Sequence, residues 1–290
     1  MSAKTRFSWV KKLFINLKAL LPYLRNKFAG RSKSEKSKLV FIFSFPRSGT
    51  HALGSLLTND SIGFHYYGEF FIFNAWHRNI EKLNHYYPFF SLRYHLNLKR
   101  QRKHWKYMRF GDTTLNARKT LQAISRIPGT HIIKIFPLHL PDEILNQLLH
   151  EFKPHVIMWR RNHLDRYVSH RKANATGVWH KTSTSEVEIE IDQVQLDTFI
   201  TDYTRFYQHF LTEATSAGCQ VLDADFSYLQ NPERVREIQK FVAFDDFSKW
   251  ELLPPAPTTF KQDKANKVQQ DYLARTGKKV EDFDFLKAKP

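Results

Sequence analysis

The chain has 290 residues, of which 42% are hydrophobic and 15% aromatic, enough apolar side chains for the core of one or two globular domains. This composition excludes a chain that is intrinsically disordered throughout. Cys219 is the only cysteine, so the chain can form neither an intrachain disulfide nor a thiolate metal cluster. We therefore expect it in a reducing compartment, the cytoplasm.

Two segments carry the net charge of +17. Residues 1–38 contain eleven Lys and Arg and a single acid, Glu35, whereas residues 91–110 contain seven Lys and Arg and no acid. The remaining residues carry equal numbers of positive and negative charges. A nucleic-acid-binding protein usually spreads basic residues over a folded face, so this distribution argues against nucleic acid as the primary partner.

The first predicted element is a basic amphipathic helix over residues 9–25, where apolar residues recur at three- and four-residue spacing. Such a helix either lies in a membrane interface and binds anionic lipid, or packs on the folded body. In the first case the protein attaches peripherally to the inner face of a membrane. Residues 30–38 form a polar linker, so we expect a leader and linker over 1–38 and one domain over 39–290.

Short apolar runs then alternate with amphipathic segments. Runs rich in β-branched and aromatic residues predict strands at 38–45, 131–136, 155–159 and 219–222. Helical spacing predicts helices at 51–57, 140–152, 195–211 and 232–242, and one that follows the third strand and ends near residue 173. This alternation indicates an α/β fold of three layers, in which helices cover both faces of a central parallel sheet.

The first strand leads into a P-loop-like turn, FSFPRSGTH (residues 43–51). Backbone N–H groups and a helix N-terminus converge in such a turn, while Arg47, Ser48 and Thr50 add side-chain donors, so we expect it to bind an anion. A nucleotide triphosphatase loop needs G-x-x-x-x-G-K-[ST]. Here Thr50 replaces the lysine and His51 the metal-binding hydroxyl, which disfavours ATP or GTP hydrolysis and a nucleotide kinase.

The second motif, WRRNHLDRYVSHRKA (residues 159–173), follows the third predicted strand. Arg161 at the strand end and Ser169 two helical turns later can hold one phosphate from two directions. Two anion-binding strand ends in one parallel sheet suit a ligand with two separated phosphate groups.

These two motifs resemble the signatures of the sulfotransferase family, over residues 39 to about 275. The family uses 3′-phosphoadenosine 5′-phosphosulfate (PAPS) as sulfuryl donor and needs no metal. The resemblance implies that the loop Arg47, Ser48, Gly49 and Thr50, with His51 beside it, binds the 5′-phosphosulfate, and that Arg161 and Ser169 bind the 3′-phosphate. Residues 260–272 resemble the late basic segment that closes over the nucleotide, which adds Lys261.

The chain departs from the cytosolic members at the catalytic base. They carry Lys-Thr-His after the second strand, whereas this chain has Lys134-Ile135-Phe136, so the lysine matches and the histidine does not. Bacterial carbohydrate sulfotransferases, such as the trehalose type, place a carboxylate shortly after the first helix, and Glu69 has that place here. The resemblance therefore implies Glu69 as base, with Arg47 and Lys134 as catalytic cations. His139, in the turn between Pro137 and Pro141, is the alternative base.

Residues 74–111 form an insert in which aromatic side chains alternate with basic ones. We interpret it as binding a hydroxyl-bearing acceptor, such as an acidic glycan, a glycolipid or another lipid-linked molecule. The same pattern is typical of single-stranded nucleic-acid binding, or of a solvated helix that covers the fold. Two hypotheses follow: a PAPS-dependent sulfotransferase acting on a carbohydrate, glycolipid or lipid hydroxyl, and a non-catalytic basic protein that binds nucleic acid or membrane on a phosphate-binding fold.

Overall fold

The computed structural model describes residues 37–71, 114–125, 127–137, 139–177, 187–255 and 267–284. The amphipathic leader at 9–25, the insert at 74–111 and Lys261 lie outside these described residues. The predictions made for them therefore remain predictions.

Five parallel strands form the central sheet in the order β2-β3-β1-β4-β5. Their bounds are β1 Lys38–Phe43, β2 Phe64–Tyr66, β3 Thr130–Ile135, β4 His155–Arg160 and β5 Val221–Asp225. Phe43 of β1 pairs with Ile135 of β3 and Met158 of β4, so the carboxyl ends of the three central strands lie side by side. The predicted parallel sheet is confirmed.

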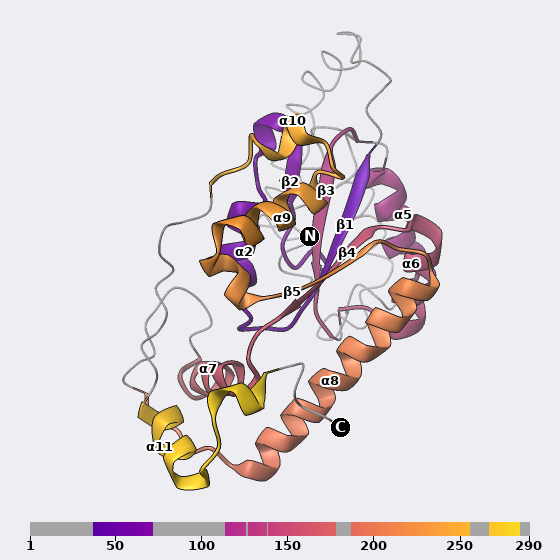
Figure 1. The fold of residues 1–290 in the computed structure, drawn as a ribbon. Helices are drawn as coiled ribbons and strands as arrows, with labels where there is room; N and C mark the ends of the chain where they lie inside the picture. The colour runs from indigo at the N-terminus through magenta and orange to yellow at the C-terminus, as the bar shows by residue number, and fades with distance from the viewer. Residues whose placement is uncertain are drawn as a thin grey trace, which may run out of the picture.

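Helices cover both faces of this sheet (Figure 1). The bounds of the longer helices are α2 Thr50–Leu56, α5 Thr114–Ile124, α6 Asp142–Phe152, α7 His163–Thr176, α8 Gln193–Ser216, α9 Pro232–Val242 and α11 Lys267–Thr276. Leu39, Phe41 and Phe43 of β1 pack with α5, α6 and α8, whereas Val40 and Ile42 pack with α2 and α9. This alternation follows from the two-residue period of a strand, and it gives the three predicted layers.

Within the described residues, the strands and helices predicted between residues 38 and 242 are present, with ends that differ by a few residues. The largest difference among the strands is at β5, predicted at 219–222 and observed at Val221–Asp225. It continues into acidic residues because Asp223 forms an ion pair of 2.6 Å with Arg160 of the neighbouring strand. Strand β2, which has three residues, and the helices α5 and α11 are not predicted from the sequence.

His131 is a fully buried titratable residue near the start of β3. Its Nε2 lies 2.9 Å from the carbonyl oxygen of Ile127, and its Nδ1 lies 3.0 Å from the hydroxyl of Tyr67. The neutral ring satisfies both contacts, with Nε2–H donating to the carbonyl and Nδ1 accepting from the hydroxyl. Burial lowers the pKa of His131 to about 4.

We expect His131 to make the folded protein less stable as the pH falls from 6.5 towards 4. In that interval the unfolded chain binds a proton that the folded chain does not, so the free energy of unfolding falls by about 1–2 kcal/mol between pH 7 and pH 5 from this residue alone. Urea unfolding at pH 7 and pH 5 should show a smaller decrease in the free energy of unfolding for His131→Gln than for the wild type. An equal decrease in both proteins would show that other groups cause the acid sensitivity.

Candidate active site

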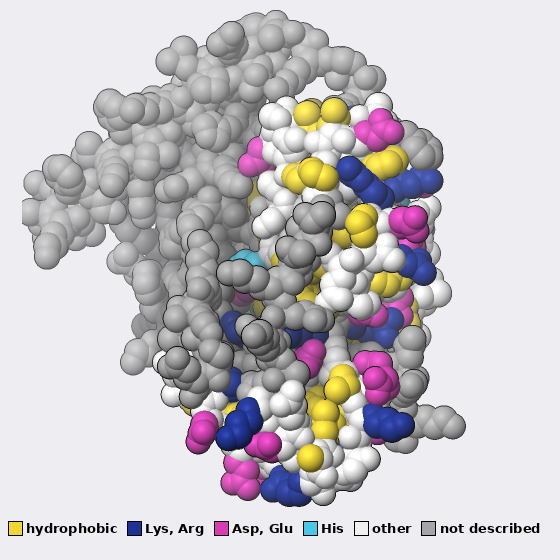
Figure 2. All heavy atoms as spheres, turned by 60° about the vertical axis from the view of Figure 1, so that its left-hand side comes forward, with side chains coloured by type: hydrophobic (Ala, Val, Ile, Leu, Met, Phe, Trp, Pro, Cys, Tyr) yellow, Lys and Arg dark blue, Asp and Glu magenta, His cyan; other side chains and the backbone are white. Residues whose placement is uncertain are grey.

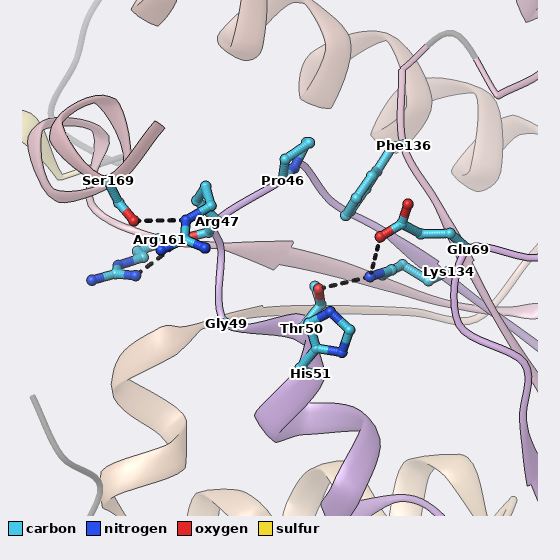
Figure 3. Close-up of a pocket in the computed structure, with 10 residues that line it drawn as sticks. All are labelled: Pro46, Arg47, Gly49, Thr50, His51, Glu69, Lys134, Phe136, Arg161 and Ser169. Atoms are coloured by element: carbon cyan, nitrogen blue, oxygen red, sulfur yellow. Dashed lines mark hydrogen bonds and ion pairs between the residues drawn. The ribbon is translucent and has the colours of Figure 1, made fainter. Parts of the chain in front are cut away.

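A cavity of about 370 Å³ opens at the carboxyl ends of β1, β3 and β4 (Figure 3). Its lining combines both sequence motifs with two charged residues of the predicted catalytic set; the residues are Pro46, Arg47, Gly49, Thr50, His51, Glu69, Lys134, Phe136, Arg161 and Ser169. In a parallel sheet the carboxyl ends of the strands meet at one edge, and this edge is where such folds bind ligands.

The loop after β1 has a backbone that only certain residues tolerate. Gly49 has φ of 77°, and a Cβ atom at this position would lie 2.3 Å from the ring of Phe226. Arg47 also has a positive φ, 69°, which a side-chain-bearing residue adopts only at a cost of about 1–3 kcal/mol. Such strain concentrates at ligand-binding sites, which agrees with the predicted anion-binding role of the loop.

Hydrogen bonds to Trp159 of strand β4 anchor this loop. The indole Nε1 of Trp159 donates a hydrogen bond of 2.8 Å to the carbonyl oxygen of Ser48, and the hydroxyl of Ser44 donates one of 3.1 Å to the carbonyl oxygen of Trp159. The hydroxyl oxygen of Ser48 itself is buried and has no hydrogen-bond partner among the described residues. A buried hydroxyl of this kind is suited to a ligand that accepts a hydrogen bond.

The two sequence motifs contact each other directly. Arg47 Nε donates a hydrogen bond of 2.9 Å to the hydroxyl of Ser169, and Arg161 Nη1 donates one of 3.1 Å to the carbonyl oxygen of Arg47. The guanidinium of Arg161 lies over the ring of Phe226, 4.8 Å from its centroid, and 3.9 Å from the carboxylate of Asp165. The predicted 5′ and 3′ anion sites are therefore parts of one continuous site.

Lys134 links the loop to Glu69. Its Nζ donates hydrogen bonds to Glu69 Oε1 at 2.9 Å and to Thr50 Oγ1 at 3.2 Å, and it lies 4.5 Å from the centroid of the Phe136 ring. The Lys134 side chain is 2% exposed, and that of Glu69 is 26% exposed at the cavity. Burial lowers the pKa of Lys134, and the adjacent Glu69 carboxylate opposes part of this shift.

Backbone pairing to β3 fixes the position of Glu69. The N–H of Tyr67 donates to the carbonyl oxygen of Ile132, and the N–H of Lys134 donates to that of Gly68, both at 2.9 Å. Residues 67–69 therefore continue the pairing of β2 with β3. This pairing places the Glu69 carboxylate beside the buried Lys134 ammonium, which also contacts Thr50 of the loop.

His139 is buried and is not among the residues that line the cavity. The backbone N–H of Phe136 donates to His139 Nδ1 at 3.1 Å, and the N–H of His139 donates back to the Phe136 carbonyl oxygen at the same distance. With Nδ1 accepting, the neutral ring carries its proton on Nε2, and burial lowers the pKa of His139 to about 4. This geometry suits a residue that closes the turn after β3, and it favours Glu69 over His139 as the candidate base.

Two aromatic residues at the site had no signal in the sequence. Phe226 follows β5 and packs on both Gly49 and Arg161, so it supports the loop and the 3′ motif together. Phe136, noted in the sequence only as the replacement for a histidine, lines the cavity and covers the Lys134 ammonium. The contacts of Phe226 join segments far apart in the chain.

Comparison with known proteins agrees with this geometry. The model of the sulfotransferase domain family matches residues 37–288. The chain belongs to the sulfotransferase family. Neither the curated proteins nor the solved structures yield a match. As a member of this family, the protein is a transferase that moves a sulfuryl group.

On the face shown in Figure 2, acidic and basic side chains of the described residues are interspersed. Within the part of the chain that the structure describes, no group of His, Cys, Asp and Glu is placed to hold a metal ion. None of the helices described is long and apolar enough to cross a membrane.

Proposed function

We propose that this sulfotransferase transfers the sulfuryl group of PAPS to a hydroxyl group of a carbohydrate, glycolipid or lipid. The observation that supports this best is that both anion-binding motifs and the Glu69–Lys134 pair line a single cavity. The anion site thereby lies beside a carboxylate that can accept a proton, which a non-catalytic phosphate-binding protein does not require.

The donor set fits a nucleotide with two phosphate groups. The buried Ser48 hydroxyl, which has no partner among the described residues, and the loop N–H groups suit the 5′-phosphosulfate. Arg161 and Ser169 suit the 3′-phosphate, with Arg47 between the two. His51 borders the 5′ part of the cavity, and Lys261 is assigned to the nucleotide by family resemblance alone. Bound PAPS supplies a sulfuryl group on a phosphate leaving group.

The chain's own residues then divide the chemistry between a base and two cations. Glu69 accepts the proton of the acceptor hydroxyl at its carboxylate. Lys134 and Arg47 face the negative charge that develops on the leaving phosphate, and preorganised cations of this kind contribute much of the catalysis of group transfer. Because burial lowers the pKa of Lys134, its ammonium is also a better proton donor to that phosphate than an exposed lysine.

The acceptor class is proposed from two features. Pro46 and Phe136 give the cavity apolar surface, and aromatic faces stack well on sugar rings. The aromatic and basic residues of 74–111 lie outside the described residues and extend this interpretation to acidic glycans and lipid-linked acceptors. A screen of such acceptors with sulfur-labelled PAPS tests the proposal, together with thermal stabilisation by 3′-phosphoadenosine 5′-phosphate (PAP) but not by ATP.

Arg161→Ala should weaken PAP binding strongly, because the 3′-phosphate loses a charge-assisted contact worth about 1.5–3 kcal/mol. The same substitution should weaken the binding of 5′-AMP, which lacks the 3′-phosphate, much less. Calorimetric titration of both nucleotides measures the two effects, with Arg171→Ala in the following helix α7 as the control for loss of one positive charge. An equal loss for PAP and AMP would place the 3′-phosphate elsewhere.

A further inference from the structure

Arg166 is a buried cation in α7 for which the proposed chemistry has no role. The residue is 2% exposed, and neither Nη1 nor Nη2 has a hydrogen-bond partner among the described residues. Its guanidinium carbon lies 2.9 Å from the ring centroid of Tyr203, 4.4 Å from that of Phe199 and 5.0 Å from that of Phe45. Aromatic rings, which attract cations through their faces, therefore surround this charge.

The charge of Arg166 is not balanced by a carboxylate in these contacts. Two acidic residues of α7 and β5 pair with other arginines: Asp165 with Arg161 and Asp223 with Arg160. Burial lowers the pKa of Arg166 to about 9, so the side chain is still positively charged at neutral pH. Burial lowers the pKa of His163 and of His170 on the same helix, and the positive charge of Arg166 lowers both further.

The position of Arg166 connects the two halves of the anion site. Phe45, on which it packs, immediately precedes Pro46 and Arg47 of the loop, and Ser169 lies three residues further along α7. Phe45 is also packed against Tyr203 of α8, with ring centroids 3.6 Å apart. One side chain thus contacts the base of the 5′ loop from the helix that carries the 3′ motif.

Stability alone does not account for this arrangement. A buried ion without a partner costs free energy, and exchanging buried ionic groups for apolar residues of similar volume is often neutral or stabilising. A methionine would fill the same aromatic cluster without that cost. The charge is therefore better explained by an interaction that the protein makes with an anionic ligand.

We propose that Arg166 is a positioning residue of the anion site, which fixes the loop after Phe45 relative to Ser169 and adds a permanent positive charge behind both phosphate-binding motifs. Its charge acts through a poorly solvated interior and is screened less than that of a surface arginine. This inference rests on the proposed binding of a nucleotide with two phosphate groups. It implies that Arg166 increases the affinity for PAP more than the affinity for the less charged 5′-AMP.

The test compares Arg166→Met and Arg166→Lys with the wild type and with Arg171→Met. Arg171 is a matched control, because it lies on the same helix, is only half-buried and bonds to Gln195, outside the cavity lining. Titration with PAP and with 5′-AMP gives the affinities, and thermal unfolding of the ligand-free proteins gives the stabilities.

We expect Arg166→Met to bind PAP about tenfold more weakly and 5′-AMP, with about half the charge, about threefold more weakly. Its unfolding temperature should stay the same or rise. Arg166→Lys, which keeps the charge, should recover most of the PAP affinity, and Arg171→Met should change it less than about twofold.

Three results would overturn the inference. Unchanged PAP affinity in Arg166→Met shows that the charge does not act on the site. A lower unfolding temperature with equal losses for PAP and 5′-AMP shows that Arg166 is a structural residue only. Failure of the wild type to bind PAP would contradict the proposed function itself. This result is distinguishable from the first two, because in those the wild type still binds PAP.

Discussion

Glu69→Gln should lower kcat by about 10²–10⁴-fold while the affinity for PAP changes by less than about twofold. Glutamine keeps the volume of the side chain, and its amide oxygen can still accept the hydrogen bond of 2.9 Å from Lys134. The substitution therefore removes basicity and leaves the cavity wall in place. Steady-state kinetics with an acceptor found in the screen, together with titration of PAP, measure the two quantities separately.

Two further variants make this expectation specific. Glu151→Gln removes the same charge from α6, where Glu151 pairs with Arg118 at 2.6 Å, and should leave kcat near the wild-type value. His139→Ala should cost much less activity than Glu69→Gln, because His139 Nδ1 accepts a hydrogen bond from the Phe136 N–H and His139 is not among the residues that line the cavity. Loss of turnover in His139→Ala with near-normal Glu69→Gln would make the histidine the base.

The parts of this protein that the sequence predicts are those set by local spacing. Apolar runs bounded by Pro46 and Pro137 mark β1 and β3, and the loop and the Arg161–Ser169 pair are recognisable because their residues are close in the chain. That both motifs share one site also follows from the sequence, since parallel strands end at one edge of the sheet.

The missed features depend on contacts between distant segments. Strand β2 has only three residues, and it lies beside β3 where Gly63 and Gly129 approach so closely that a Cβ on Gly129 would lie 2.5 Å from the Gly63 oxygen. The stacking of Phe226 on Arg161 and the bond of Arg47 to Ser169 arise in the same way. The spacing of apolar and polar residues along the sequence does not indicate which side chains of distant segments contact each other.

Gly49→Ala tests how tightly the loop is constrained, and we expect both lower stability and loss of PAP binding. An alanine there adopts a left-handed backbone, which costs about 1–2 kcal/mol. Its Cβ would also lie 2.3 Å from a Phe226 ring that already packs on Arg161, and overpacking of this kind costs about 1–3 kcal/mol more. Either the loop or the ring must move, and each carries part of the anion site, so PAP affinity should fall at least about tenfold.

Gly177→Ala separates the two causes. Gly177 has φ of 68°, close to that of Gly49, but a Cβ there meets no atom within 4 Å. This control therefore carries the backbone cost without the collision, and it should lose stability by the smaller amount and keep its PAP affinity. Thermal unfolding and PAP titration of both variants give the comparison. If Gly49→Ala bound PAP as well as Gly177→Ala does, the loop would be free to adjust around Phe226, and its close packing would not be what shapes the 5′ site.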